Sequence, residues 1–137
     1  MATQLTLSIV TPEREVLRTQ VDTVELPGAE GYFGVLPGHT PMLATLKVGR
    51  LAYKVGQDVS VVGVAFGFAE VLPDRVTVLA EIAERADEID ISRAEAALER
   101  AEQRLSRSES DLDYERARVA LDKAALRLEI ASKARAR

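Results

Sequence analysis

The feature of this sequence that most restricts its fold is an abrupt change in residue usage near Arg85. All eight glycines and all five prolines lie before that residue, and the rest of the chain contains neither. Glycine and proline are common in turns between short strands and disfavour the interior of a helix, so the two parts of the chain cannot share one architecture. We therefore expect two structural units, residues 1–86 and residues 87–137.

The first unit has the alternation that is typical of β-strands. Leu5, Leu7 and Ile9 are separated by single polar residues, and a similar run extends from Leu51 to Val55. A period of two gives each strand one face toward a core and one toward water. Turn residues separate the runs, as at Pro27 and Gly28. The pattern predicts an antiparallel β-sandwich or flattened barrel.

The second unit is dominated by Ala, Arg, Glu and Leu, which are strong helix formers. Its apolar residues recur every three or four positions and form two narrow seams: Ile91, Ala94, Leu98, Ala101 and Leu105, then Tyr114, Ala117, Leu121, Ala124, Leu128 and Ala131. A polar segment separates the seams, which predicts an antiparallel two-helix hairpin and an α+β fold class. Ser92 with Glu95 resembles a capping box for the first helix, and Asp111 or Asp113 is expected to cap the second.

Several classes of function are disfavoured by composition. The chain has no cysteine, which excludes disulfides and thiolate metal sites, and its net charge of −4 with no unbroken basic run argues against nucleic-acid binding. The most apolar window, Val59 to Leu72, is shorter than the roughly 20 residues of a membrane-spanning helix, so we expect no membrane insertion.

Catalysis and metal binding are also not expected. The single histidine, His39, lies between two prolines in a turn, where a structural hydrogen bond is the better explanation. No glycine-rich phosphate loop is present, and no nucleophile can be matched with a base and an orienting group. We therefore expect no catalytic residues, no metal and no enzyme.

One group of cations allows two interpretations. Arg93 and Arg100 on the first helix, and Lys123 and Arg127 on the second, each stand one residue before a seam position. A hairpin folded about Ser110 would bring Arg100 level with Lys123 and Arg93 level with Arg127. The four cations then form either a phosphate site or a set of solvated charges paired with neighbouring carboxylates.

The final helix is strongly basic. From Arg116 to Arg137 seven basic residues face only Asp122 and Glu129. This cationic arm either complements the helix dipole and keeps the surface charged, or docks against an acidic partner.

Three motifs resemble a known family. The stretch GAEGYFGVLPGHTPMLATLKVG, from Gly28 to Gly49, resembles a GxxGxxGxLPGHxPL loop; GFAEVLPDRVTVLAE, from Gly67 to Glu81, resembles GGFxEVxPxxVTVLA; and IDISRA, from Ile89 to Ala94, resembles IDxxRA. In this order they resemble the epsilon-subunit family of F-type ATP synthases over essentially the whole chain. Phe66 departs from that pattern, because a small residue is more usual there, and Tyr32 stands where the family often has a polar one.

The resemblance implies a non-catalytic central-stalk subunit of a bacterial proton-translocating ATP synthase. Its sandwich would bind the gamma subunit and the c-ring, and its helices would reach the beta and alpha subunits of the catalytic head and restrain ATP hydrolysis. Such a protein is peripheral to the cytoplasmic face of the bacterial plasma (inner) membrane, and the lack of a transit segment before the first strand favours bacteria over an organelle. An alternative is a stand-alone nucleotide-sensing protein.

The resemblance also implies two sets of site residues. The loop that contacts the c-ring is matched by Glu30, Gly31, Tyr32 and His39. Some family members bind ATP in the folded hairpin, and the matching positions here are Glu84, Ile89, Asp90, Arg93, Ala94, Arg100 and Arg127, with Lys123 where those members carry arginine. The family requires no cofactor, and ATP enters as a regulatory ligand.

Overall fold

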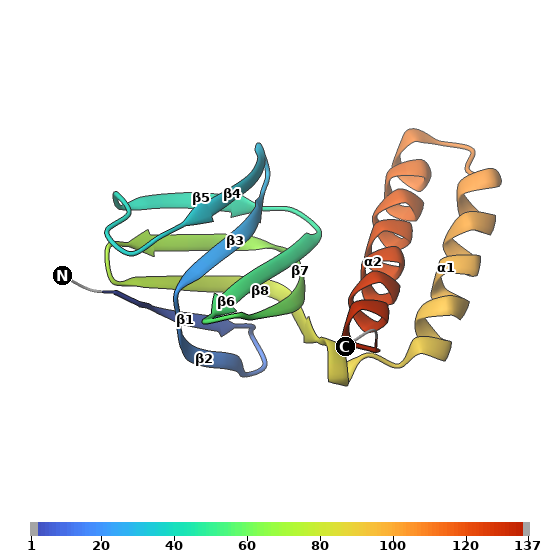
Figure 1. Cartoon of the computed structure of the whole chain (residues 1–137). Coiled ribbons are helices and arrows are strands. Elements are labelled where there is room, and N and C mark those ends of the chain that lie inside the picture. The colour runs from blue at the N-terminus through green and yellow to red at the C-terminus, as the bar shows by residue number, and fades with distance from the viewer. Residues whose placement is uncertain (1–2, 136–137) are drawn as a thin grey trace. The chain divides into compact units, whose positions relative to one another are not determined.

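The computed structural model of the chain describes residues 3–135, with the side chains of residues 3–132 (Figure 1). The chain divides into two compact units, Met1–Glu84 and Arg85–Arg137, two residues before the division expected from the sequence. The strands precede the helices along the chain, which confirms the predicted fold class of a β-sandwich followed by a helical hairpin.

The first unit is built from eight short or medium strands. They are β1 (Leu5–Val10), β2 (Glu15–Val21), β3 (Thr23–Gly28), β4 (Gly31–Val35), β5 (Met42–Leu46), β6 (Gly49–Val55), β7 (Asp58–Leu72) and β8 (Arg75–Arg85). They pair in the order β2-β1-β8-β7-β5-β3-β4, and β6 pairs separately with β3 and β7. Because β3 and β7 are bridged twice, by β5 and by β6, the sheet closes on itself as expected for a flattened barrel.

The long strand β7 turns a corner between its two partners. Residues Asp58 to Val64 pair with β6, and residues Gly67 to Val71 pair with β5. Between these ladders Phe66 has φ 61° and Gly67 has φ 118°. This left-handed conformation is costly for a residue with a Cβ atom. The cost explains why small residues are more usual than phenylalanine at the position of Phe66.

Gly67 is required at the corner for a second reason. A Cβ atom there would lie 2.0 Å from the carbonyl oxygen of Leu79 and 2.9 Å from the Cα of Ala80. Both atoms belong to the backbone of the neighbouring strand β8, which cannot move aside without breaking its own pairing. Only glycine therefore allows β7 and β8 to approach this closely.

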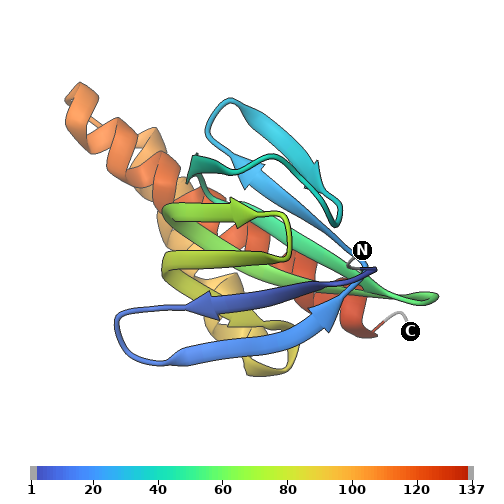
Figure 2. The same ribbon diagram turned by 90° about the vertical axis from the view of Figure 1, so that its left-hand side faces the viewer.

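One pair of strands departs from the antiparallel expectation. β1 runs parallel to β8, from Thr6 opposite Arg75 to Val10 opposite Leu79. The β1–β2 hairpin (blue in Figure 2) thus extends the sheet beyond the last strand, with β2 at the edge. Parallel pairing needs a long connection between the partners, and here the connection is almost the whole unit.

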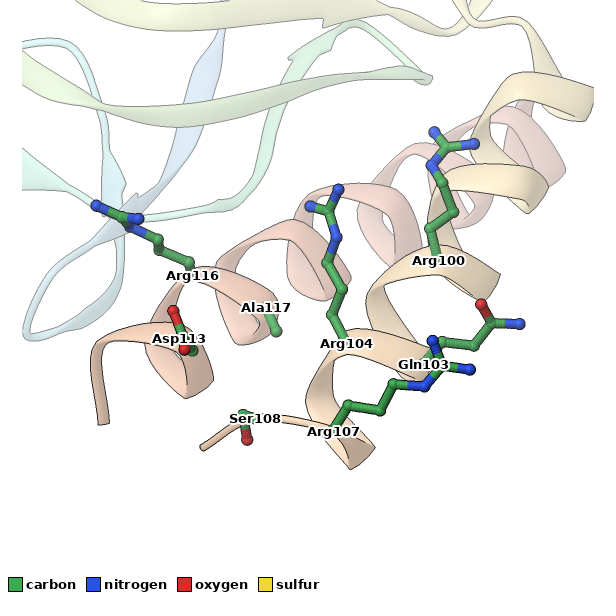
Figure 3. A pocket seen from close by; sticks show the side chains of 8 residues that line it. All are labelled: Arg100, Gln103, Arg104, Arg107, Ser108, Asp113, Arg116 and Ala117. Atoms are coloured by element: carbon green, nitrogen blue, oxygen red, sulfur yellow. The ribbon is translucent and has the colours of Figure 1, made fainter. Parts of the chain in front are cut away.

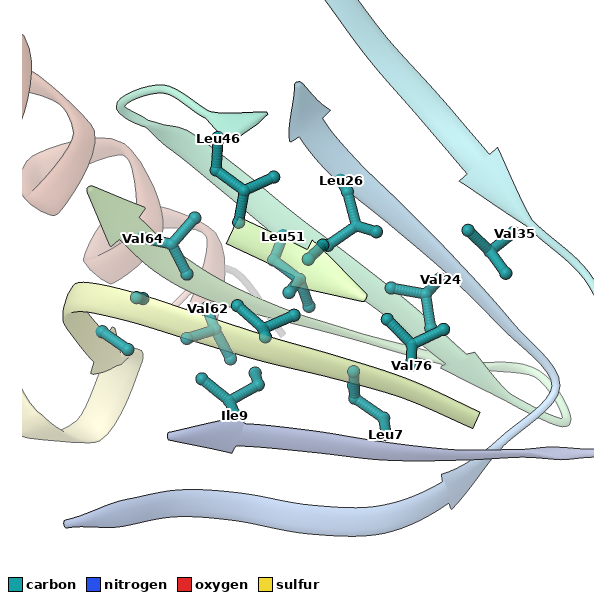
Figure 4. Close-up of a cluster of buried hydrophobic side chains, with 14 of the residues drawn as sticks. Leu7, Ile9, Val24, Leu26, Val35, Leu46, Leu51, Val62, Val64 and Val76 are labelled. Atoms are coloured by element: carbon teal, nitrogen blue, oxygen red, sulfur yellow. The ribbon is translucent and has the colours of Figure 1, made fainter. Parts of the chain in front are cut away.

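The core of the unit confirms the predicted alternation. On β1, Leu5, Leu7 and Ile9 are completely buried. They pack with valines and leucines of the other strands, including Val76 and Leu51 (Figure 4). Burial of one such side chain contributes about 1.5 to 3 kcal/mol, so this single cluster accounts for most of the driving force of the unit.

The second unit is a helical hairpin. A short 3-10 turn, η1 (Ala86–Glu88), precedes α1 (Ile91–Ser106) and α2 (Asp111–Arg135), which lie side by side and antiparallel (Figure 1). The small members of the predicted seams are buried, namely Ala94, Ala101, Ala117, Ala124 and Ala131. The large members are only half-buried, and Tyr114 is 45% exposed. The hairpin therefore buries little apolar surface for its length.

Candidate functional site

The residues of the IDISRA motif shape the start of α1. The carboxylate of Asp90 accepts a hydrogen bond from the backbone N–H of Arg93 at 3.1 Å, which makes Asp90 the N-cap of the helix. The predicted capping box is wrong, because Ser92 already lies inside the first turn. Ile89 is the C-cap of η1, Ala94 is buried, and Arg93 is exposed at the beginning of the helix.

The other predicted nucleotide residues lie on three elements. Lys123 and Arg127 are half-buried on α2, and both have polar partners in this structure. Glu84 lies near the end of β8, in the first unit, and also has a partner. One carboxylate oxygen of Asp90 is used in the helix cap.

The register of the hairpin differs from the one that the sequence suggested. The bend is centred between the end of α1 at Ser106 and the start of α2 at Asp111, slightly before Ser110. Six residues inward from those two ends are Arg100 and Ala117, and both line the same cavity. Arg100 is thus level with Ala117, and Lys123 lies about 9 Å further along α2.

A cavity of about 540 Å³ opens at the bend of the hairpin. Its lining residues come from the last turns of α1, the bend and the first turns of α2 (Figure 3): Arg100, Gln103, Arg104, Arg107, Ser108, Asp113, Arg116 and Ala117. We call this the bend cavity. Four of its eight residues are arginines, and only Arg100 belongs to the residues predicted for nucleotide binding.

Hydrogen bonds fix the backbone of the bend. The hydroxyl of Ser108 donates to the carbonyl of Leu105 at 3.0 Å, and the backbone N–H of Arg107 donates to the carbonyl of Arg104 at 3.2 Å. The hydroxyl of Ser110 accepts from the backbone N–H of Asp113 at 3.1 Å. Ser110 therefore caps α2, and the prediction of an aspartate cap at this helix is wrong.

The arginines of the bend cavity were not predicted as a group, although the sequence contains a signal for three of them. Arg100, Arg104 and Arg107 are spaced by four and three residues, which places them on one face of a helix. The fourth arginine, Arg116, comes close only because the bend is short. That contribution depends on the three-dimensional register and has no local pattern.

The residues predicted for the c-ring loop fall into two groups. Glu30, Gly31 and Tyr32 lie at the turn from β3 into β4, whereas His39 lies beyond the opposite end of β4. The strand between the two groups is roughly 17 Å long. The Nδ1 atom of His39 lies 2.6 Å from the carbonyl oxygen of Thr40, in agreement with a structural role for the histidine.

Tyr32, on β4, is held against strand β6, which pairs with the other side of β3. Its hydroxyl accepts a hydrogen bond from the backbone N–H of Arg50 at 3.2 Å. The ammonium of Lys47 and the guanidinium of Arg50 lie 5.4 and 5.8 Å from the centre of its ring. Gly49 makes this possible, because a Cβ atom there would lie 2.6 Å from the tyrosine oxygen. The ring is nevertheless 46% exposed and available to a partner.

Neither a metal cluster nor a membrane span is found in the described part of the chain. Residues 3–135 contain no group of three or more histidine or acidic side chains placed to hold a metal ion. Among the helices described there, none has the length and apolar character needed to cross a membrane.

Comparison with protein families matches both units. Residues 4–86 match the β-sandwich domain of the ATP synthase delta/epsilon chain, and residues 87–132 match the long α-helix domain of the same chain. The ATP synthase epsilon chain of Syntrophobacter fumaroxidans is 53% identical, covering 97% of this chain and 99% of that protein. The epsilon chain of Solibacter usitatus is 48% identical, with the same coverage.

Solved structures share the fold. A chain in the mitochondrial ATP synthase of Euglena gracilis superimposes with a TM-score of 0.79 at 24% identity, covering all of this chain and 84% of that one. A chain in the central stalk and c-ring of the Tetrahymena thermophila enzyme gives 0.55 at 17% identity, covering 95% of each. The family models account for both units, and the chain therefore belongs to the ATP synthase delta/epsilon family, whose epsilon chains are non-catalytic subunits of the ATP synthase complex.

Proposed function

We propose that this chain is a rotor subunit of the central stalk, which joins the catalytic head to the c-ring through its sandwich unit. The observation that carries the proposal is the match of both units to the family, with 53% identity to an epsilon chain over nearly the whole length. The structural neighbour from Tetrahymena belongs to a central stalk and c-ring assembly. The chain would bind the gamma subunit and the c-ring and lie peripherally on the cytoplasmic face of the bacterial membrane.

The exposed Tyr32 supports a contact at the β3–β4 turn. Its ring is fixed by a hydrogen bond and by two cations, so it would not lose much side-chain entropy on binding. Glu30 and Gly31 lie beside it at the same turn. We assign the c-ring contact to this turn, and His39 would belong to a separate surface because it lies at the other end of β4.

We further propose that the helical hairpin restrains ATP hydrolysis by contacting the alpha and beta subunits. The support is local: four arginines line the bend cavity, and seven basic residues from Arg116 to Arg137 face only Asp122 and Glu129, although residues 87–137 as a whole carry 11 basic and 12 acidic side chains. A local basic surface of this kind favours an acidic partner surface and speeds encounter with it. Beyond Ser132, the side chains of the cationic arm lie outside the described residues.

ATP is proposed as the regulatory ligand of the folded hairpin. The cations of this site would be Arg93, Arg100, Lys123 and Arg127, and the IDISRA motif matches the family members that bind ATP. Lys123 and Arg127 have polar partners here, so the phosphates would have to replace those contacts. A ligand that binds the hairpin folded on itself, but not a form of it that contacts the alpha and beta subunits, would lower the population of the contacting form by its difference in affinity.

The rate of ATP hydrolysis by the catalytic head tests the proposed coupling and regulatory roles. The head should be assembled with the full chain, with a chain ending at Glu84, or without either, and its ATPase rate compared. We expect binding of both forms and inhibition by the full chain alone. Binding of both forms without any inhibition would contradict the regulatory role and leave the coupling role in place.

An ATP titration of the isolated full chain tests the ligand. Lys123→Arg restores the planar guanidinium of the ATP-binding members, so it should bind ATP more tightly than the unchanged chain. No saturable binding by either protein at millimolar ATP would rule out the nucleotide proposal. Neither family model nor relative favours the alternative of a stand-alone nucleotide sensor.

A further inference from the structure

The arginines of the bend cavity lack acidic partners inside the hairpin. Among the described residues, no carboxylate oxygen lies within 4.0 Å of the guanidinium groups of Arg100, Arg104, Arg107 or Arg116. The only acidic residue in the cavity wall is Asp113. The wall of this hollow of about 540 Å³ thus carries four arginines and one aspartate, and the acidic residues of the same turns that are outside the wall are Glu102, Glu109, Asp111 and Glu115.

Arginines that share a cavity wall favour an anion there. Exposed like charges repel each other only weakly in water, and a ligand with several negatively charged oxygens removes that repulsion. Arginine presents a planar fork of donors that matches phosphate oxygens in pairs. The wall thus has the donor chemistry of an oligophosphate site.

The remaining residues of the bend-cavity wall restrict the kind of ligand that it can bind. The wall contains no aromatic ring, and its one apolar residue is Ala117, so nothing there would stack against or enclose a nucleobase. The hydroxyl proton of Ser108 is already donated to Leu105, which leaves Gln103 as the neutral donor. Recognition would rest on charge and on the phosphate chain alone.

The N-terminus of α2 does not by itself create an anion-binding site at the bend cavity. Its first turn carries Asp111 and Asp113, and these offset the positive end of the helix dipole. The backbone N–H of Asp113 is already bound by the Ser110 hydroxyl. The guanidinium groups are therefore the main donors available to an anion at this cavity.

We propose that the bend cavity is a binding site for a short oligophosphate anion of the pyrophosphate class. The site is separate from the proposed nucleotide residues, with which it shares only Arg100. Arg104 and Arg107 line the cavity from the end of α1 and Arg116 lines it from α2, with their guanidinium groups pointing in different directions (Figure 3), so an anion that drew them together would cross-link the two helices close to their bend. Occupancy would stabilise the folded hairpin by mass action.

Calorimetric titration of the full chain with pyrophosphate, in magnesium-free buffer of low ionic strength, tests the site. The cavity variant is Arg104→Gln with Arg107→Gln. Its matched control is Arg18→Gln with Arg118→Gln, which removes the same charge from two arginines outside the cavity that pair with Glu15 and Asp122. We expect the cavity variant to bind about tenfold more weakly than the control, the equivalent of about 1.4 kcal/mol.

A second variant keeps the test decisive if the cavity variant loses helical structure. Asp113→Asn removes the only negative charge of the wall and leaves its size unchanged, so pyrophosphate should bind several-fold more tightly. Binding should also weaken steeply with added salt, because the groups are exposed. Arg93→Gln with Lys123→Gln should weaken ATP binding and leave pyrophosphate binding unchanged, which separates the two sites.

The proposal would be overturned by the absence of saturable pyrophosphate binding. It would equally be overturned if the cavity variant and its matched control bound with the same affinity, since that would show a response to net charge alone. If the cavity variant is unfolded, an unchanged affinity in Asp113→Asn would overturn it instead.

Discussion

The carboxylate of Asp22 accepts a hydrogen bond from the backbone N–H of Gly56, 2.7 Å away, although 34 residues separate them in the chain. Its second oxygen accepts a bond from the side-chain amide of Gln4 at 3.2 Å. The N–H of Gly56 is the main cause that lowers the pKa of Asp22, followed by the amide of Gln4, with a smaller contribution from the charge of Lys54. This carboxylate ties the β6–β7 turn to the junction of β2 and β3.

The stability of the sandwich should therefore depend on pH through Asp22. A carboxylate whose pKa is lowered by folding stabilises the folded state fully above its ordinary pKa of 3.8, and that contribution is lost as the pH falls through the lower folded value. Asp22→Asn should be less stable than the unchanged chain at pH 7, and urea midpoints should converge as the pH falls below about 3.8. Asp74→Asn is the control. If the difference in urea midpoint between Asp22→Asn and the unchanged chain stayed constant below pH 3.8, the pH dependence would not come from Asp22.

Gly67→Ala should destabilise the sandwich by about 3 kcal/mol or more, because the methyl group would overlap the backbone of β8 and the left-handed conformation adds its own cost. Gly34→Ala in β4 is the matched control, since a Cβ atom there meets nothing within 4 Å. Denaturant unfolding followed by a signal of the β-unit measures both. Equal losses of stability in Gly67→Ala and Gly34→Ala would show that the corner of β7 accommodates a Cβ atom without an added cost.

Asp90→Ala should cost about 1 kcal/mol of helix stability, because the backbone N–H of Arg93 loses its partner. Ser92→Ala, at the position that the sequence suggested as the cap, should change stability by no more than about 0.5 kcal/mol. Amide hydrogen exchange in the first turn of α1 gives the comparison. A larger loss of helix stability in Ser92→Ala than in Asp90→Ala would show that Ser92 is the cap.

Ala101→Leu should disrupt the hairpin, because Ala101 is 2% exposed and the added side chain must push the helices apart at a cost of about 1 to 3 kcal/mol. Ala96→Leu, on the exposed side of the same helix, adds the same volume and should be tolerated. Far-ultraviolet circular dichroism reports the helices, and exchange protection in β1 reports the sandwich. Loss of protection in β1 would mean that the two units do not fold independently.

The parts of the fold that the sequence predicts are those with a local period. Leu5, Leu7 and Ile9 alternate at every second residue, and Ala94 and Ala101 recur at a helical spacing, so the buried face of each element can be read directly. The resemblance of the loop and helix motifs then identified the family. Such patterns can be predicted because they depend only on residues that are close together in the sequence.

The parts that the sequence does not predict depend on residues far apart in the chain. The parallel pairing of Thr6 with Arg75 leaves no mark in either strand. Ser110 caps α2 because of the geometry of the bend, in competition with two nearby aspartates that are equally good cap residues. The bend cavity needs Arg116 of α2 to share a wall with Arg104 and Arg107, and that depends on where the bend is centred.

The placement of β8 between β1 and β7 also sets an order of events during synthesis. β1 is the first strand to leave the ribosome, yet its partner on one side, Arg75 to Leu79, is among the last parts of the sandwich to be made. Until then one edge of the β1–β2 hairpin has no neighbour, and pairing must wait for the closure of a loop that spans most of the unit. The nascent sandwich can therefore complete its sheet only after β8 has been made.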